Sequence, residues 1–217
     1  MIVPNGGINT DFLKNFNSFI REQITAYNRR FFIVCGGGST SRHYQKAARE
    51  VIGEIACEDV DWLGIHATRL NAHLLRTIFR DIAYFRVKKQ YDKEDKVTEP
   101  VMIASGWKPG WSTDFDAVLL AQEYGAKTVI NLTNITKVYD KDPNKNSDAK
   151  PLDKLSWKDY RTMVGDQWNP GMNVPFDPVA AKKAEELGLK VVILKGDDLE
   201  NVKNYLAGNE FIGTILE

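Results

Sequence analysis

The sequence lacks several features that would assign it to a familiar class. It has two cysteines among 217 residues, Cys35 and Cys57, and no spaced cysteine motif. A disulfide framework and a zinc site are therefore not indicated, and a reducing compartment is expected. Excess charge of one sign is also absent, since 29 Lys+Arg balance 29 Asp+Glu, which argues against a nucleic-acid-binding protein.

Long apolar segments are missing as well. No apolar run approaches the roughly 20 residues that a membrane span needs, and the N-terminus lacks the basic and apolar regions of a signal peptide. We therefore expect a cytoplasmic protein that binds neither membranes nor nucleic acid.

A set of nucleophilic catalytic residues is not recognisable either. The three histidines, His43, His66 and His73, have no partner at metal-ligand spacing, and no Ser/His/Asp or Cys/His arrangement is present. The glycine-rich stretch 36–39 is not a P-loop, because no Gly-Lys-Ser/Thr follows it. It is not a dinucleotide fingerprint, because position 41 is serine.

What the sequence does contain is an alternation of apolar strands and amphipathic helices. The patterns predict helices over residues 11–27, 41–52, 62–84, 116–124, 179–187 and 199–206, and strands over residues 31–35, 101–104, 128–132, 190–194 and 211–216. Thr10 or Asp11 is expected to cap the first helix, and Gly188 to end the fifth. This alternation predicts an α/β fold with a parallel or mixed sheet covered on both faces. Residues 88–99 are expected to form a charged surface loop and residues 140–151 an exposed excursion.

The stretch Gly-Trp-Lys-Pro-Gly-Trp-Ser-Thr-Asp, residues 106–114, lies between a predicted strand and a predicted helix. Ligands of open α/β sheets bind at such junctions. The hydroxyls of Ser112 and Thr113 at a helix start suit a phosphate, whereas the carboxylate of Asp114 repels one unless a cation lies between. The stretch therefore indicates phosphate chemistry with a metal or a lysine nearby. The alternative is a helix cap at Ser112 and a helix-dipole partner at Asp114.

Three further segments carry candidate residues with structural alternatives. Gly36, Gly37 and Gly38 precede a helix that bears Arg42, and together they suit an anion, although a tight strand–helix turn has the same composition. Asp61 opens a helical pattern, and a cap is the favoured interpretation on sequence alone. Residues 133–143, which include an Asp-Pro pair, are by themselves a loop.

Together and in this order, these segments resemble the amino acid kinase family and, within it, the UMP kinases. The resemblance runs from about Ile2 to the C-terminus. It rests on Gly106–Asp114, on Val138-Tyr139-Asp140-Lys141-Asp142-Pro143, on Gly36-Gly37-Gly38 with Arg42, on residues 64–72, and on Phe176-Asp177-Pro178-Val179-Ala180-Ala181-Lys182. Each motif is moderately specific, but five in the correct order and spacing are strong.

The resemblance implies one domain over residues 1–217, a three-layer αβα sandwich with a mainly parallel sheet, whose N-terminal part binds the acceptor and whose C-terminal part binds ATP. It implies transfer of the γ-phosphate of ATP to UMP, with Mg²⁺ accompanying the ATP, in a homo-oligomer that is a hexamer or a dimer. The implied catalytic residues are Asp114, which would organise the reacting groups and Mg²⁺, and Arg42. The implied UMP-binding residues are Gly37, Asp61, Gly106, Trp107, Lys108, Pro109, Gly110, Trp111, Ser112 and Thr113, and the implied ATP-binding residues are Gly38, Arg42, Thr133, Tyr139 and Asp142.

The sequence departs from the family pattern at two places. Thr136-Lys137 replaces the usual Asp-Gly before Val138-Tyr139, which bears on the ATP contacts. The printed chain starts after the family's first strand and its Gly-Gly-Ser loop, so we expect this form to be a weak kinase. Two other functions stay open from the sequence: an amino acid kinase acting on a carboxylate, carbamate or phosphonate, and a nucleotide-binding protein without turnover.

Overall fold

The structure, a computed structural model, describes residues 1–143, 145–167 and 174–217. Contacts between residues divide the chain into two compact units, Met1–Leu120 and Ala121–Glu217, named below the N-terminal unit and the C-terminal unit. Both contain helices packed on strands, and pairing is mainly parallel, which confirms the predicted α/β class. None of the described helices is both long enough and apolar enough to cross a membrane.

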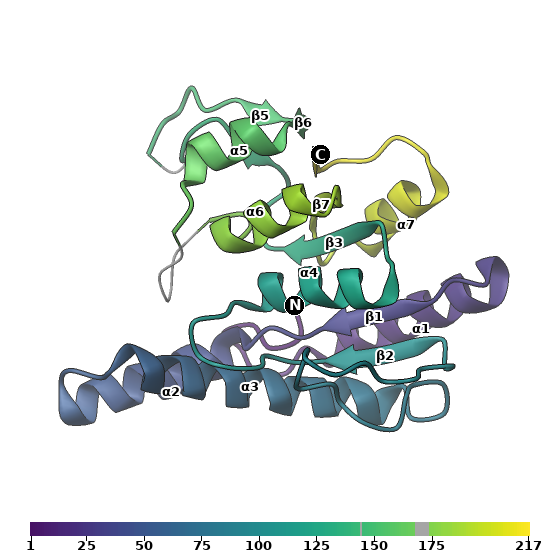
Figure 1. The fold of residues 1–217 in the computed structure, drawn as a ribbon, viewed down its shortest axis with the longest axis horizontal. Helices are drawn as coiled ribbons and strands as arrows, with labels where there is room; N and C mark the ends of the chain where they lie inside the picture. The colour runs from purple at the N-terminus through teal and green to yellow at the C-terminus, as the bar shows by residue number, and fades with distance from the viewer. Residues whose placement is uncertain (144, 168–173) are drawn as a thin grey trace. The chain divides into compact units, whose positions relative to one another are not determined.

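The N-terminal unit is built around two parallel strands. Its elements are α1 (Thr10–Tyr27), β1 (Phe31–Val34), α2 (Gly38–Ile52), α3 (Cys57–Ile78), β2 (Val101–Ala104) and the start of α4 (Thr113–Tyr124) (Figure 1). Val34 lies opposite Ala104 in the register of β1 and β2. Because parallel strands end at the same edge of a sheet, the loops that follow β1 and β2 leave from neighbouring points.

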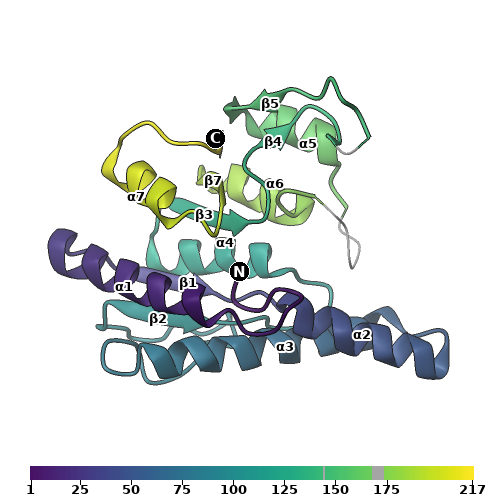
Figure 2. The same cartoon turned by 180° about the vertical axis from the view of Figure 1, so that it is seen from behind.

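Helix α3 is the long support of this unit. It packs against both α2 and β2, and it runs beside β2 in the two opposite views of Figures 1 and 2. All four residues of β2 are buried, which is why its sequence is continuously apolar. Helix α1 presents an apolar face to the core, with the buried residues Phe12, Leu13, Phe16, Phe19 and Ile20.

The C-terminal unit contains a four-stranded sheet in the order β3-β7-β8-β6. Its elements are β3 (Thr128–Thr133), β4 (Val138–Tyr139), β5 (Pro151–Leu152), β6 (Lys154–Leu155), α5 (Trp157–Val164), α6 (Pro178–Glu186), β7 (Lys190–Lys195), α7 (Leu199–Ala207) and β8 (Thr214–Leu216). Strands β7 and β8 are antiparallel, and β4 and β5 form a separate antiparallel pair. Gly213 lies directly before β8. A larger residue would not fit there, because its Cβ would lie 2.5 Å from the Leu194 side chain.

Several sequence predictions are corrected in their details. Asn9, not Thr10 or Asp11, caps α1, since its Oδ1 accepts from the Phe12 N–H at 3.0 Å. Helix α3 begins at Cys57 and ends at Ile78, several residues earlier at each end than predicted. Glu58 and Asp59 in its first turn favour that start through the helix dipole.

The C-terminal unit differs from expectation in its small elements. Helix α5 and strands β4, β5 and β6 were not predicted, because they are too short for a clear periodic signal. Gly188 takes the left-handed conformation expected of it, with φ of +60°. Residue 144, within the predicted excursion 140–151, lies outside the described residues.

The predicted charged loop 88–99 begins with a buried lysine rather than an exposed one. The Lys88 side chain is 1% exposed, and its Nζ lies 3.2 Å from Asp95 Oδ2 and donates to the Lys93 carbonyl at 2.7 Å. A buried ammonium is tolerated only with such partners. Lys88 therefore belongs to the interior, and the exposed loop begins after it.

Candidate active site

The glycine loop, residues 36–38, leaves β1 and enters α2. The amide of Asn71 on α3 donates to the carbonyls of Gly36, at 2.8 Å, and Gly37, at 3.2 Å. Gly38 has φ of +62°, and a Cβ there would lie 2.8 Å from the Val3 carbonyl oxygen. Position 38 therefore requires glycine, both for its backbone conformation and for its close approach to the Val3 carbonyl. The interpretation of this loop as a tight strand–helix turn predicts the same requirement.

Arg42 lies on the exposed face of α2, shortly after the glycine loop. Its Nη2 is 3.5 Å from the side-chain oxygen of Asn5, a distance at the outer limit of a hydrogen bond. The N-terminal segment is tied to the same helix start, because the Ser39 N–H donates to the Val3 carbonyl at 2.9 Å. The guanidinium is thus close to the glycine loop in sequence and accessible to a ligand.

The tryptophan loop, residues 106–113, leaves β2 and enters α4. Three side chains of α3 hold its backbone: Thr68 Oγ1 accepts from the Gly106 N–H at 2.9 Å, Arg69 Nη2 donates to the Trp107 carbonyl at 3.0 Å, and Asp61 Oδ2 accepts from the Gly110 N–H at 2.8 Å. The same helix holds the glycine loop through Asn71. Helix α3 therefore fixes both loops that follow the parallel pair.

Asp61 has a different role from the helix cap favoured by the sequence. It lies in the second turn of α3, because the helix begins at Cys57, and the N-cap residue is Ala56. The carboxylate instead reaches across to the Gly110 backbone. The cap interpretation is therefore wrong, and Asp61 is a residue of the tryptophan loop's support. His66, which has no partner at metal-ligand spacing in the sequence, is exposed on α3 next to Trp62.

Aromatic rings and one lysine organise the tip of the tryptophan loop. The rings of Trp107 and Trp111 meet edge to face with centroids 4.9 Å apart, and Trp111 meets Phe115 in the same way at 4.7 Å. Lys108 Nζ lies 4.4 Å from the Trp107 ring centroid and 4.3 Å from that of Trp111. Both distances are within the range of a cation–π interaction, so the loop carries a positive charge held at a defined place.

The start of α4 supplies both the predicted hydroxyls and the predicted carboxylate. Ser112 Oγ accepts from the Phe115 N–H at 3.1 Å, so the cap interpretation of Ser112 is confirmed. Thr113 is the first helical residue, and Asp114 follows it in the first turn, half-buried. The positive end of the helix dipole therefore lies next to the Asp114 carboxylate.

Asp116 was not among the predicted site residues. It is completely buried on α4, and neither carboxylate oxygen has a hydrogen-bond partner among the described residues. Burial raises the pKa of Asp116 from 3.8 to about 7, while the Trp107 N–H, close by but not in hydrogen-bond geometry, favours the charged form. A signal existed in the sequence, because Asp116 is four residues before the buried Leu120 and thus shares the apolar face of α4.

The predicted ATP-side residues lie in the C-terminal unit. Thr133 is the last residue of β3, and its carbonyl accepts from the Gly196 N–H at 2.8 Å. Tyr139 is in β4 opposite Pro151. The Asp142 carbonyl accepts from the Asn146 N–H at 3.0 Å. These residues follow the carboxyl end of β3, the edge where ligands bind in α/β sheets.

Comparison with known proteins gives a consistent result. Residues 95–195 match the model of the amino acid kinase family. A uridylate kinase of Sulfurisphaera tokodaii is 36% identical over 213 residues, which cover 94% of this chain and 93% of the relative. The crystal structure of uridylate kinase from Archaeoglobus fulgidus has a TM-score of 0.82 and 31% identity, covering 96% of this chain and 94% of that one. The crystal structure of UMP kinase from Bacillus anthracis, at 20% identity, shares the fold with a TM-score of 0.77, covering 97% and 88%.

Proposed function

This chain belongs to the amino acid kinase family and to its uridylate kinases, and we propose that it transfers the γ-phosphate of ATP to UMP in pyrimidine nucleotide biosynthesis. The observation that carries the proposal is the support of two loops by one helix. The glycine loop and the tryptophan loop leave the same edge of a parallel pair, and α3 holds both. Such a fixed edge suits a phosphate ester.

The acceptor side of the proposal lies in the N-terminal unit. UMP would bind to Gly37, to Asp61 and to the tryptophan loop, where Gly106 and Gly110 are already positioned by α3. Lys108, whose Nζ lies near the Trp107 and Trp111 rings, would supply the cation that a phosphate next to Asp114 requires. Arg42 would bind the phosphate through hydrogen bonds from its exposed guanidinium.

Asp114 would orient the reacting groups from the first turn of α4. Phosphoryl transfer needs positioning and charge neutralisation more than covalent chemistry, so the lack of a nucleophilic set in the sequence fits this reaction. Among the described residues, no group of three His, Cys, Asp or Glu side chains is arranged to hold a metal ion. Mg²⁺ would accompany ATP, bound to its phosphates, with Asp114 as the protein carboxylate that could face it.

The donor side of the proposal lies in the C-terminal unit. Most ATP contacts would come from Thr133, at the end of β3, and from Tyr139 and Asp142 on the segment after it. Gly38 and Arg42 of the N-terminal unit are the other predicted ATP contacts. Lys137, which stands where the family usually has glycine, forms an ion pair with Asp153. The departure at Thr136-Lys137 thus adds a lysine whose charge is paired with a carboxylate.

Among the functions left open by the sequence, UMP phosphorylation has the strongest support. The matched uridylate kinases span nearly the whole chain, which favours UMP over a carboxylate, carbamate or phosphonate as the acceptor. A cytoplasmic location and a hexameric or dimeric assembly stay predictions, the second to be measured by light scattering after size exclusion.

The test is an ADP-release assay with UMP, CMP, AMP and GMP, together with the melting temperature in each nucleotide. UMP should support turnover and raise the melting temperature most. A ligand at about 100 times its Kd stabilises the protein by roughly 2.7 kcal/mol. Equal responses to all four monophosphates would contradict the uridine assignment, and UMP binding without ADP release would indicate a binding protein.

A further inference from the structure

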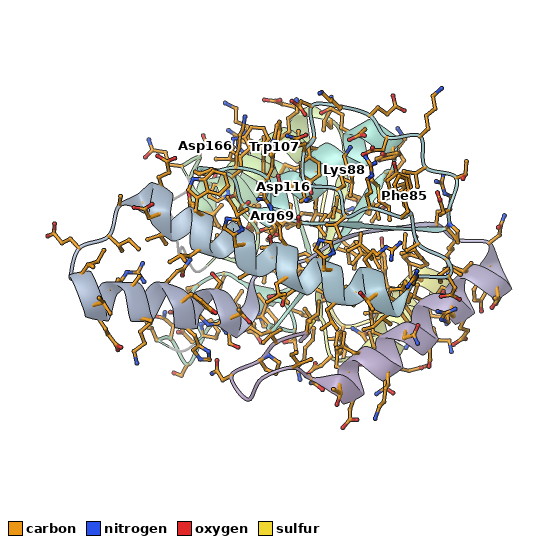
Figure 3. The ribbon with its side chains drawn as sticks, turned by 90° about the horizontal axis from the view of Figure 1, so that it is seen from below. Arg69, Phe85, Lys88, Trp107, Asp116 and Asp166 are labelled. Carbon is orange, nitrogen blue, oxygen red and sulfur yellow. The ribbon has the colours of Figure 1, made fainter. Side chains whose placement is uncertain are left out.

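We propose that Arg69 and Asp116 are positioning residues for the backbone of Trp107, Arg69 by holding its carbonyl and Asp116 as a buried acceptor near its N–H, and that they set the tryptophan loop for its acceptor nucleotide. The inference rests on the proposed function, because it concerns how the same loop receives UMP. Figure 3 shows the two side chains and Trp107 in one part of the N-terminal unit. Arg69 comes from α3 and Asp116 from α4, so two helices act on one residue.

Arg69 acts on the carbonyl side of Trp107. Its Nη2 donates to the Trp107 carbonyl at 3.0 Å, and its guanidinium carbon lies 5.9 Å from the Trp62 ring centroid. The Nε atom is buried and has no hydrogen-bond partner among the described residues. The guanidinium is therefore committed to the loop rather than to solvent, and one of its donors remains to be satisfied.

Asp116 acts on the amide side of Trp107. The Trp107 N–H is close enough to the carboxylate to favour its charged form, and both oxygens have spare acceptor capacity because no described residue donates to them. Arg69 thus restrains one of the two peptide groups that flank the Cα of Trp107, and Asp116 offers an acceptor to the other.

The position of the Trp107 backbone determines where the neighbouring side chains lie. The Trp107 ring meets Trp111, and Lys108 Nζ lies within 4.4 Å of both ring centroids. If the Trp107 backbone rotates, the ring pair and the ammonium move with it. The restraint on one residue therefore fixes the aromatic and cationic surface that the loop offers to a nucleotide.

The burial of Asp116 does not serve stability. A buried carboxyl without a hydrogen-bond partner destabilises the folded state, and an apolar residue of α4 at this position would not carry that cost. Titratable groups kept in such unfavourable surroundings are candidates for functional roles. The proximity of Trp107 N–H identifies the role as positioning of the loop.

Asp116→Ala and Arg69→Met test the inference in the full chain. We expect UMP to bind about tenfold or more weakly in Arg69→Met, as expected for losing a hydrogen bond from a charged group. UMP should also bind more weakly in Asp116→Ala, which removes the acceptor near the Trp107 N–H, and ATP binding should change by less than about twofold in both variants. Asp116→Ala should melt at the same temperature as the parent or higher. Asp116→Asn, which keeps an oxygen that can accept from the Trp107 N–H, should recover most of the UMP affinity.

Arg76→Met is the matched control for Arg69→Met, because Arg76 is on the same helix and also has a buried, unpartnered Nε. It should leave UMP affinity unchanged. A second measurement, the ¹⁵N spectrum of the indole N–H groups without nucleotide, uses Trp107→Phe to assign the Trp107 signal. That signal should shift in Asp116→Ala and Arg69→Met and stay in place in Arg76→Met.

The outcomes separate this inference from the proposed function. If the parent chain does not bind UMP, the proposed function fails, but a shifted Trp107 signal still supports the positioning role. An unshifted Trp107 signal overturns the inference whatever the UMP affinity. So does an equal loss of UMP and ATP affinity together with a lower melting temperature, because it would assign the two residues to general stability.

Discussion

The tryptophan loop and the segment after β3 both follow a parallel strand, yet they are held by different means. Side chains of α3 bind the tryptophan loop at Gly106, Trp107 and Gly110, and Gly106 is buried. Residues 133–143 are ordered mainly by backbone pairing, through the β4–β5 pair and the Gly196 N–H, and by exposed ion pairs such as Lys141–Asp148. One buried side-chain contact also holds the backbone of this segment, because Thr214 Oγ1 accepts from the Val138 N–H at 2.8 Å. Three side chains of one helix hold the tryptophan loop, whereas the segment after β3 is held mainly by backbone pairing and by exposed ion pairs.

This difference indicates how much each region contributes to stability and to ligand binding. Buried hydrogen bonds cost about 1–3 kcal/mol when one partner is removed, whereas exposed ion pairs contribute about 0–1 kcal/mol. A loop held in advance loses little freedom when its ligand binds. Selectivity for the nucleotide acceptor should therefore reside in the tryptophan loop, and substitutions in the two regions should differ in size.

The largest effect is expected from Asp114→Asn. The change preserves shape but removes the charge that would orient the reacting groups, so kcat should fall by about 10²–10³, as when one preorganised electrostatic group is removed from an active site. Stability should change by less than about 1 kcal/mol, the value of a helix-dipole interaction. The measurement is steady-state ADP release combined with the melting temperature. Unchanged kcat in a folded variant would return Asp114 to a role at the helix end only.

The next largest effect is the pH dependence that Asp116 gives to stability. Because burial raises its pKa from 3.8 to about 7, the folded state binds a proton more tightly than the unfolded state. The free energy of unfolding therefore falls as the pH rises from about 4 to about 7. Three pKa units correspond to about 4 kcal/mol at most, and Asp116→Asn should abolish this fall.

Urea unfolding of both proteins at several pH values between 4 and 8 measures the effect. Asp81→Asn is the control, since its partner Arg21 lowers the pKa of Asp81 to about 2, so that its contribution is constant over this range. Burial also raises the pKa of Cys35, to about 12, and that thiol does not titrate there. Parallel curves for the parent and Asp116→Asn would contradict the raised pKa.

A smaller effect is expected where α3 meets the start of the tryptophan loop. Thr68→Val keeps the shape of the side chain but leaves the buried Gly106 N–H without its acceptor. Stability should fall by about 1–3 kcal/mol, and UMP binding should weaken while ATP binding is unchanged. Thr77→Val on the same helix is the control, because its hydroxyl is exposed and donates only to the His73 carbonyl at 2.8 Å. Equal losses in the two variants would show that the loop contact adds nothing.

The sequence predicted the framework because long periodic patterns carry most of the fold. The continuous apolar run at residues 101–104 is β2, and the spacing of Phe12, Phe16 and Phe19 gives α1. The caps and short elements were less predictable, since Asn9 and α5 depend on local geometry that periodicity does not record.

The candidate site was predicted in its loops but not in its supports. The glycines of residues 36–38 and the glycines and hydroxyls of residues 106–113 can be recognised in the sequence, because each group lies between a predicted strand and a predicted helix. Arg69, Thr68 and Asp116 act through contacts 9 to 38 positions away along the chain, and a single sequence does not specify which distant backbone group a helix residue meets. Asp61 illustrates this. Its position at the start of a helical pattern suggested a helix cap, whereas its carboxylate accepts a hydrogen bond from the Gly110 N–H.

The smallest effect, which sharpens the comparison most directly, is expected in the segment after β3. Lys141→Ala removes the partner of Asp148, whose side chain is 77% exposed. Because water already solvates both charges, stability should change by less than about 0.5 kcal/mol. A double-mutant cycle with Asp148→Ala, followed by urea unfolding, measures the pair alone. Screening by salt should reduce even this small coupling, since exposed charges lose their attraction as the Debye length shortens. A coupling above about 1 kcal/mol would mean that the two regions are held equally firmly, and the contrast between a preorganised acceptor loop and a locally ordered donor segment would have to be abandoned.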